Sequence, residues 1–182
     1  MKTPQTSWLF RSNRPYIKPE HESNVINFKY QGSVDSLYFK LVQSPLCDWI
    51  ADQLPTWLAP NLITLAGFSC TIMCYLLMLF LYGDSTEGPV DSWFCYLVGV
   101  SYFIYSTLDN VDGKQAKRTG SGSPMGMLFD HGCDATTAVI QALILQRICQ
   151  IGSSWRAILA ALMPTVPFYY ITLEAYYLGK ME

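Results

Sequence analysis

The first patterned stretch of the chain repeats apolar residues at helical spacing, with polar residues between them. Its apolar positions are Val34, Leu37, Tyr38, Leu41 and Val42. This i, i+3, i+4, i+7, i+8 spacing predicts an amphipathic helix, and Pro45 predicts the start of a second one that ends before Pro55. Because Trp49 and Trp57 suit a headgroup boundary, we predict that both helices lie in the membrane interface. A soluble helix pair packed on a partner is the alternative.

Beyond residue 60 the apolar runs become long enough to cross a bilayer. Residues 62–82 carry no charge, and their length at ~1.5 Å rise per residue covers a hydrocarbon core of ~30 Å. We expect Asn61 to cap this helix. Residues 93–108 form a second apolar run, which reaches membrane length only if the helix continues through Asp109 and Asp112.

Two further helices complete the expected fold. The loop at 120–124 precedes a helix over about 125–150, and a fourth apolar run follows at 155–173. Pro164 and Pro167 predict a kink in that run. The fold class is therefore all-α, a polytopic membrane helix bundle of about four spanning helices preceded by an interfacial amphipathic region.

The regions and their charges suggest an orientation. Residues 1–32 are rich in proline and scattered charge, which predicts a flexible tail without a cleaved signal, whereas residues 33–60 are interfacial and residues 61–182 are transmembrane. Basic residues are frequent before residue 61 and absent from the loop at 83–91, so we expect the lead-in on the cytoplasmic side. Arg147 and Arg156, which flank the turn before the fourth apolar run, go against this bias.

Composition narrows the function classes. The formal net charge of −2, without a basic block, gives no reason to expect a nucleic-acid partner. Hydrophobic residues make up 51% of the chain, and most of the six cysteines lie inside apolar runs. We therefore expect reduced, structural cysteines in a membrane protein.

Four aspartates form the strongest candidate for chemistry. Asp109 and Asp112 are three residues apart and Asp130 and Asp134 are four apart, so each pair lies on one face of a helix. Ionised carboxylates at membrane depth cost roughly 2.5 kcal/mol or more each, which calls for a compensating cation. Oxygen ligands of this kind suit Mg²⁺ or Mn²⁺, and two such ions would bind a diphosphate.

Small and basic residues accompany the acids. Gly113, Ala116 and Gly126 predict gaps where a ligand can approach the helix backbone, although close helix packing is the alternative explanation. Lys117 and Arg118 are expected to reach phosphate oxygens.

A general base is the remaining part of the predicted chemistry. His131 lies next to one acid and three residues before Asp134, so it is a candidate general base. Asp134 is the rival candidate.

These residues together resemble the signature of the CDP-alcohol phosphatidyltransferase family. The matching positions are Asp109, Asp112, Gly113, Ala116, Lys117, Gly126, Asp130 and Asp134. The segments PTWLAPNLIT and LFDHGCD are similar to those of eukaryotic choline and ethanolamine phosphotransferases. Lys117 stands where the family usually has arginine, which removes bidentate phosphate geometry but keeps the charge.

The resemblance implies an enzyme that transfers phosphoethanolamine or phosphocholine from CDP-ethanolamine or CDP-choline to diacylglycerol. It implies metal ligands at Asp109, Asp112, Asp130 and Asp134, with His131 as the base. The nucleotide would then be bound by Asn61, Gly113, Ala116, Lys117 and Gly126. The enzyme would be an integral membrane protein of the endoplasmic reticulum or Golgi, with membrane lipids around it and its site facing the cytoplasm; a homodimer is compatible with the resemblance.

The number of helices leaves room for other readings. Family members usually have at least six core spanning helices, so we expect residues 61–182 to be the N-terminal part of a larger catalytic bundle. One alternative is a catalytically silent truncated protein that binds lipid or a full-length partner. Another is an intramembrane prenyltransferase, which also uses aspartates to hold magnesium diphosphate.

Overall fold

The computed structural model describes residues 36–178, and within them the regular structure is entirely helical. The elements are η2 (Phe39–Gln43), α2 (Ser44–Gln53), α3 (Pro60–Tyr82), α4 (Ser92–Thr119), α5 (Pro124–Ile148) and α6 (Trp155–Leu178). This confirms the all-α prediction. The predicted tail at 1–32 lies outside the described residues.

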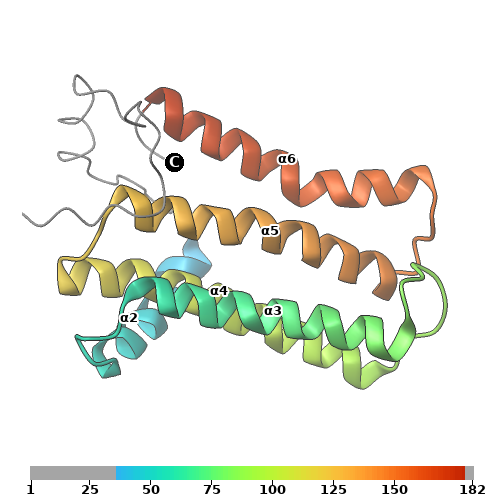
Figure 1. Ribbon diagram of the computed structural model, residues 1–182, viewed down its shortest axis with the longest axis horizontal. Helices are drawn as coiled ribbons and strands as arrows, with labels where there is room; N and C mark the ends of the chain where they lie inside the picture. Colours follow the sequence, from blue (N-terminus) through green and yellow to red (C-terminus); the bar gives the residue numbers. More distant parts are fainter. Residues whose placement is uncertain (1–35, 179–182) are drawn as a thin grey trace, which may run out of the picture.

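The four long helices lie side by side along the long axis of the molecule (Figure 1). Helix α3 packs against α4 and α5, α5 packs against α6, and the short α2 packs against α4. The connections at 83–91 and 149–154 lie at one end of the bundle, whereas α2 and the α4–α5 connection lie at the other (Figure 1). The candidate site occupies the α2 end.

Helix α3 begins two residues earlier than the sequence suggested. Ala59, in an extended conformation, is the N-cap, and Pro60 is the first helical residue. The prediction that Asn61 caps the helix is therefore wrong. Proline fixes φ near the helical value and needs no hydrogen bond in the first turn, so the helix starts at Pro60 and includes Asn61.

Close contact between α3 and α4 depends on Gly67. A Cβ atom at this position would lie 3.3 Å from Cβ of Leu108, tighter than ordinary side-chain packing. Small residues of this kind let two helices approach closely within a membrane. The approach brings the first turns of α3 against the acidic part of α4.

Length and apolarity distinguish the helices that cross a membrane. Among the described residues, α3 and the segment Trp155–Glu174 of α6 are both long and apolar enough to span it. Helix α4 continues through Asp109 and Asp112 to Thr119, which gives it the length that a span requires, but it is not among the helices that are apolar enough; the expectation of about four spans stays a prediction. Helix α6 contains Pro164 and Pro167 without a break, and its axis bends near the middle (Figure 1).

The amphipathic region differs in one respect from its prediction. The chain stays helical from η2 into α2, because the wide turn of η2 leads directly into Ser44 without a break at Pro45. Cys47 and Ala51 are buried, whereas Trp49 and Trp57 are 63% and 80% exposed. Their placement at a membrane interface stays a prediction.

Arg147, a basic residue that opposed the predicted charge bias, has a structural role. It is buried at the end of α5, where its Nη1 donates to the carbonyl oxygens of Ser85 (2.7 Å) and Glu87. Its guanidinium also lies 5.5 Å from the ring centre of Tyr82. This arginine anchors the 83–91 connection.

All six cysteines are free thiols, as predicted.

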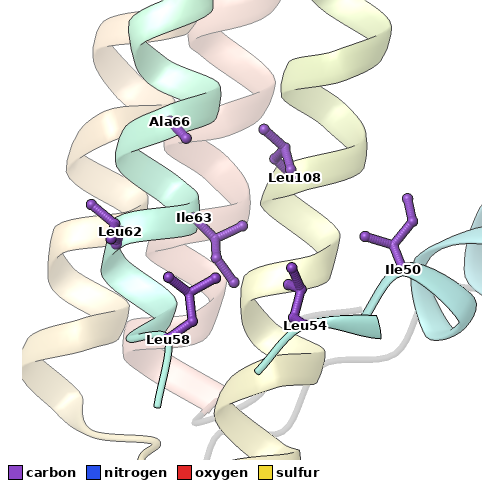
Figure 2. A pocket seen from close by; sticks show the side chains of 7 residues that line it. All are labelled: Ile50, Leu54, Leu58, Leu62, Ile63, Ala66 and Leu108. Atoms are coloured by element: carbon purple, nitrogen blue, oxygen red, sulfur yellow. The ribbon is translucent and has the colours of Figure 1, made fainter. Parts of the chain in front are cut away.

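An apolar pocket opens where α2, the following connection, α3 and α4 meet (Figure 2). Its lining residues are Ile50, Leu54, Leu58, Leu62, Ile63, Ala66 and Leu108. Ile63 also belongs to a buried cluster with Cys47, Ala51 and Val111. The α2 end of the bundle therefore has its own apolar core beside the acidic residues.

Candidate functional site

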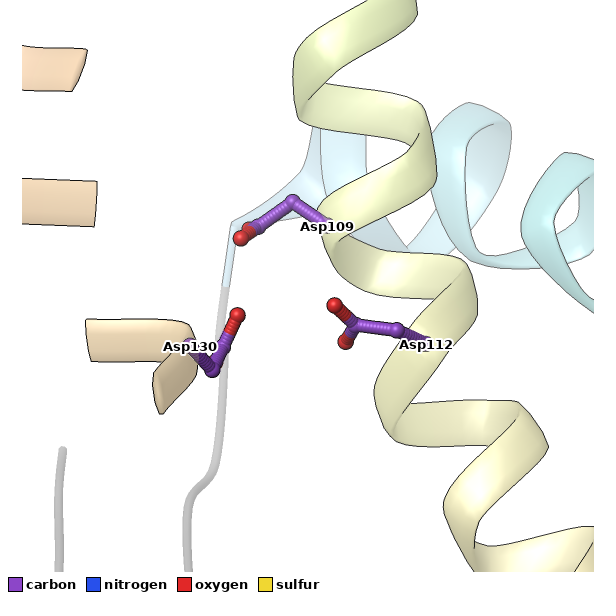
Figure 3. Close-up of side chains that lie close together, drawn as sticks. All are labelled: Asp109, Asp112 and Asp130. Carbon is purple, nitrogen blue, oxygen red and sulfur yellow. The ribbon is translucent and has the colours of Figure 1, made fainter. Parts of the chain in front are cut away.

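Three aspartates converge between α4 and α5. Asp109 and Asp112 reach from α4 toward Asp130 of α5 (Figure 3), and one carboxylate oxygen of each lies within 4.8 Å of the others. The three-residue spacing on α4 places both of its acids on the side that faces α5. The sequence prediction that acids from two helices would meet is confirmed for these three residues.

The three acids differ in whether their carboxylate oxygens have hydrogen-bond donors. Asp112 is only 5% exposed and accepts a hydrogen bond from the Thr64 hydroxyl of α3. Within the described part of the chain, Oδ1 of Asp109 and Oδ1 of Asp130 are buried without any hydrogen-bond partner. Buried carboxylate oxygens that lack donors are costly, and a hard divalent cation satisfies them. The cluster therefore fits a divalent metal.

Asp134 lies beside this cluster, but it is not one of the three residues whose oxygens lie within 4.8 Å of one another. It is near enough to Asp109 and Asp130 to interact electrostatically with both. Its Oδ1 accepts a hydrogen bond from the hydroxyl of Tyr105, which lies one turn before Asp109 on α4. Its role as a metal ligand stays a prediction.

Sequence reasoning missed two residues that contact the acids. Thr64 lies in the first turns of α3 and Tyr105 lies four residues before Asp109, so each is one helical turn from a residue that had been singled out. The i, i+4 spacing from Asp109 to Tyr105 was the available signal. Neither hydrogen bond could be read from local spacing, because Thr64 bonds Asp112 and Tyr105 bonds Asp134, each on another helix.

Two of the predicted nucleotide residues, Asn61 and Gly126, lie close together at the start of α5. A Cβ atom at Gly126 would lie 3.4 Å from Oδ1 of Asn61 and 3.3 Å from Oγ of Ser123. Ser123 caps α5 by accepting a hydrogen bond of 3.0 Å from the Gly126 amide. Asn61 and Gly126, 65 positions apart, are thus neighbours.

The glycine on α4 has open space around it. Among the described residues, and apart from its chain neighbours and the nearby backbone of its own helix, no heavy atom lies within 4 Å of a Cβ built at Gly113, which is exposed and follows Asp112 directly. Ala116 lies one turn beyond Asp112 on the same side of the helix. Both leave room beside the acids for a ligand.

The two basic residues of α4 differ in placement. Lys117 is exposed in the last turn. Arg118 instead donates from Nη1 to the carbonyl oxygens of Ala51 and Leu54, both at 2.7 Å. The guanidinium of Arg118 thus binds carbonyl oxygens at the end of α2, and its contact with phosphate stays a prediction.

His131 lies on the side of α5 that meets α6. Its ring is 6.4 Å from the ring of Phe168, in an edge-to-face arrangement. It follows Asp130 directly, so its backbone borders the acidic cluster while its side chain packs toward α6. Whether it acts as the base stays a prediction.

Comparisons with known proteins agree with this arrangement. The sequence profile of a family described as CDP-alcohol phosphatidyltransferase matches residues 57–178. Choline/ethanolaminephosphotransferase 1 of Arabidopsis thaliana is 35% identical over 91% of the chain and 42% of its own length. Ethanolaminephosphotransferase 1 of Homo sapiens is 40% identical over 76% of the chain and 36% of its own length.

A third relative is an uncharacterised CDP-alcohol phosphatidyltransferase class-I protein of Dictyostelium discoideum. It is 37% identical over 87% of the chain and 40% of its own length. The chain thus spans about two fifths of the length of the curated relatives it matches. The matched region contains α3 to α6 and all four aspartates.

Proposed function

Because the chain belongs to the CDP-alcohol phosphatidyltransferase family, we propose that it transfers phosphoethanolamine or phosphocholine from the CDP-alcohol to diacylglycerol. The products are phosphatidylethanolamine or phosphatidylcholine and CMP. One observation carries the proposal: acids of two helices converge within 4.8 Å, and two of their buried oxygens lack a hydrogen-bond donor.

Asp109, Asp112 and Asp130 would hold Mg²⁺ or Mn²⁺, with Asp134 as a further ligand. When bound, the metal neutralises the diphosphate and stabilises the negative charge on the departing CMP. The chain supplies rigid ligands for this purpose, since Asp112 is fixed by Thr64 and both helices are packed on α3.

Asn61, Gly113, Ala116, Lys117 and Gly126 would surround the nucleotide and its phosphates. The contact between Asn61 and Gly126 supports this assignment, because it joins two of these residues from different helices. The open space at Gly113 lets the ligand approach the backbone next to Asp112. Lys117 is exposed and contributes positive charge at the rim.

The reaction requires a base for the lipid alcohol. His131 or Asp134 would take the proton of the diacylglycerol hydroxyl, whose oxygen then attacks the β-phosphorus in line. The bond from that phosphorus to the bridging oxygen breaks, and CMP leaves. Asp134 lies nearer the clustered acids, whereas His131 packs toward α6.

The surroundings of the site suit two substrates of opposite solubility. The exposed apolar side chains of the long helices would contact membrane lipids, through which diacylglycerol arrives. We place the acidic site toward the cytoplasm, where the nucleotide is found, in the endoplasmic reticulum or Golgi. A homodimer is compatible with these exposed faces.

Replacement of one acid tests the proposal. Membranes that contain the Asp112→Ala variant should not label lipid from CDP-[14C]ethanolamine, diacylglycerol and Mg²⁺, whereas the wild-type chain should. Asp52→Ala is the matched control, because Asp52 is an exposed acid of α2. Labelling by Asp112→Ala at the wild-type level would overturn the proposal.

A catalytically silent lipid-binding or partner-binding protein is the second candidate. It is favoured by α6, which exposes apolar residues along its length: Trp155, Ile158, Leu159, Leu162, Met163, Val166, Tyr169, Tyr170 and Ile171. Such a surface suits lipid or another transmembrane helix. In that case co-expression would change the activity of a full-length phosphotransferase, while the chain alone would show none.

A further inference from the structure

Gln115 makes an unusual set of contacts for a residue of a spanning helix. It is fully buried in α4, one turn beyond Asp112. Its Nε2 donates to the carbonyl oxygens of Pro55 (2.9 Å) and Leu58 (3.2 Å). Its Oε1 lies 3.4 Å from Nη1 of Arg118, which completes its hydrogen bonding. None of these groups belongs to the acidic cluster.

Both acceptors of Gln115 lie in the α2–α3 connection, residues 54–59. The amide of Leu58 also donates to the Pro55 carbonyl (3.1 Å), so residues 55–58 form a turn. Gln115 donates hydrogen bonds to the first and the last carbonyl oxygen of this turn. Arg118 fixes the beginning of the same connection through the Leu54 carbonyl. The connection is therefore attached to α4 through its backbone.

The connection leads directly into the first turn of α3. That helix starts after Ala59, and no side chain caps its first turn. Asn61 and Thr64 of the first turns face the candidate site, one beside Gly126 and the other bonded to Asp112. Because proline fixes the entry at residue 60, displacement of the turn would move Asn61, whereas Thr64, one turn further along, is also held by its hydrogen bond to Asp112.

We propose that Gln115 is a positioning residue for the nucleotide part of the site, acting through the 54–59 connection on Asn61. This inference rests on the proposed function. Gln115 touches neither the acids nor the space at Gly113, so its effect is on where the first turn of α3 lies. The competing explanation is that helix packing at Gly67 alone places α3.

Two matched glutamine variants separate these explanations. Gln115→Met keeps the side-chain volume and removes both donors. Gln146→Met removes a comparable buried donor at the other end of the bundle, where Nε2 of Gln146 bonds the Ala157 carbonyl at 3.1 Å. The measurements are KM and kcat for CDP-ethanolamine, KM for diacylglycerol, and binding of radiolabelled CDP-ethanolamine to the solubilised protein.

Gln115→Met should raise KM and weaken binding for CDP-ethanolamine by about tenfold, while kcat and KM for diacylglycerol stay within about twofold. Gln146→Met should leave all four quantities unchanged, even if both variants melt at a lower temperature. Unchanged nucleotide binding by folded Gln115→Met would overturn the inference, as would an equal loss in the control.

A second variant covers failure of the first to fold. Gln115→Leu also removes the two donors and adds no charge beside the acids. It should show the same selective loss of nucleotide affinity, and wild-type affinity would overturn the inference. A wild-type chain that binds nucleotide but forms no lipid would contradict the proposed function alone; one that binds no nucleotide would contradict both.

Discussion

The hydroxyl of Thr64 in α3 donates a hydrogen bond to the carboxylate of Asp112 in α4. Both residues are buried, and 48 positions separate them in the sequence. The bond orients one acid of the cluster while Oδ1 of Asp109 and Oδ1 of Asp130 remain without donors. Helix α3 therefore contributes to the site by orienting Asp112, although it supplies no acid itself.

Removal of this hydroxyl should weaken metal activation. Thr64→Val keeps the shape and frees the Asp112 carboxylate to rotate, so the Mg²⁺ concentration for half-maximal activity should rise by about tenfold or more. Thr71→Val is the control, because Thr71 is equally buried on α3 and its hydroxyl has no hydrogen-bond partner among residues 36–178. Identical Mg²⁺ titrations for wild type and Thr64→Val would contradict this prediction.

The bond from Tyr105 to Asp134 should affect turnover. Tyr105→Phe removes the donor and leaves the Asp134 carboxylate free to rotate, so we expect kcat to fall by about tenfold or more. Tyr102→Phe, at an exposed position on the same helix, should have no effect. Lipid synthesis at saturating substrates measures both, and equal rates for Tyr105→Phe and wild type would show that this bond is not used.

Nucleotide binding should be sensitive to a larger side chain at Gly126, because Asn61 and Ser123 lie close to this position. Gly126→Ala adds a methyl group 3.4 Å from Asn61 and 3.3 Å from Ser123, and we expect KM for CDP-ethanolamine to rise by about tenfold. Gly132→Ala places its methyl group in open space on the same helix, so its KM should not change. Equal KM values for the two variants would argue against a nucleotide site there.

Arg147 should matter for stability and not for substrate affinity. Arg147→Met removes two hydrogen bonds to the 83–91 connection, and we expect the free energy of unfolding to fall by about 2–3 kcal/mol. Arg156→Met, at an exposed residue of α6, should be neutral. Thermal unfolding in detergent tests the difference, and a selective change in KM would point to a role at the site instead.

The spacing of residues within single segments predicted the helices and the placement of each pair of acids on one helix face. The continuation of α4 through Asp112 followed from the length that a span requires, and the structure has it. Asn61 was misassigned because Pro60 starts the helix two residues earlier. The hydrogen bonds from Arg118 to the carbonyl oxygens of Ala51 in α2 and of Leu54 just after it could not be predicted, because no sequence pattern around Arg118 reveals them.

The length of α4 sets the depth of the acids. With 28 residues at ~1.5 Å each, the helix measures about 42 Å, some 12 Å more than a hydrocarbon core of ~30 Å. Asp109 comes 17 residues after Ser92, roughly 26 Å along the axis. A span that begins at Ser92 would thus have Asp109 and Asp112 close to the far boundary of the hydrocarbon core, which is the depth that the proposed function expects for them.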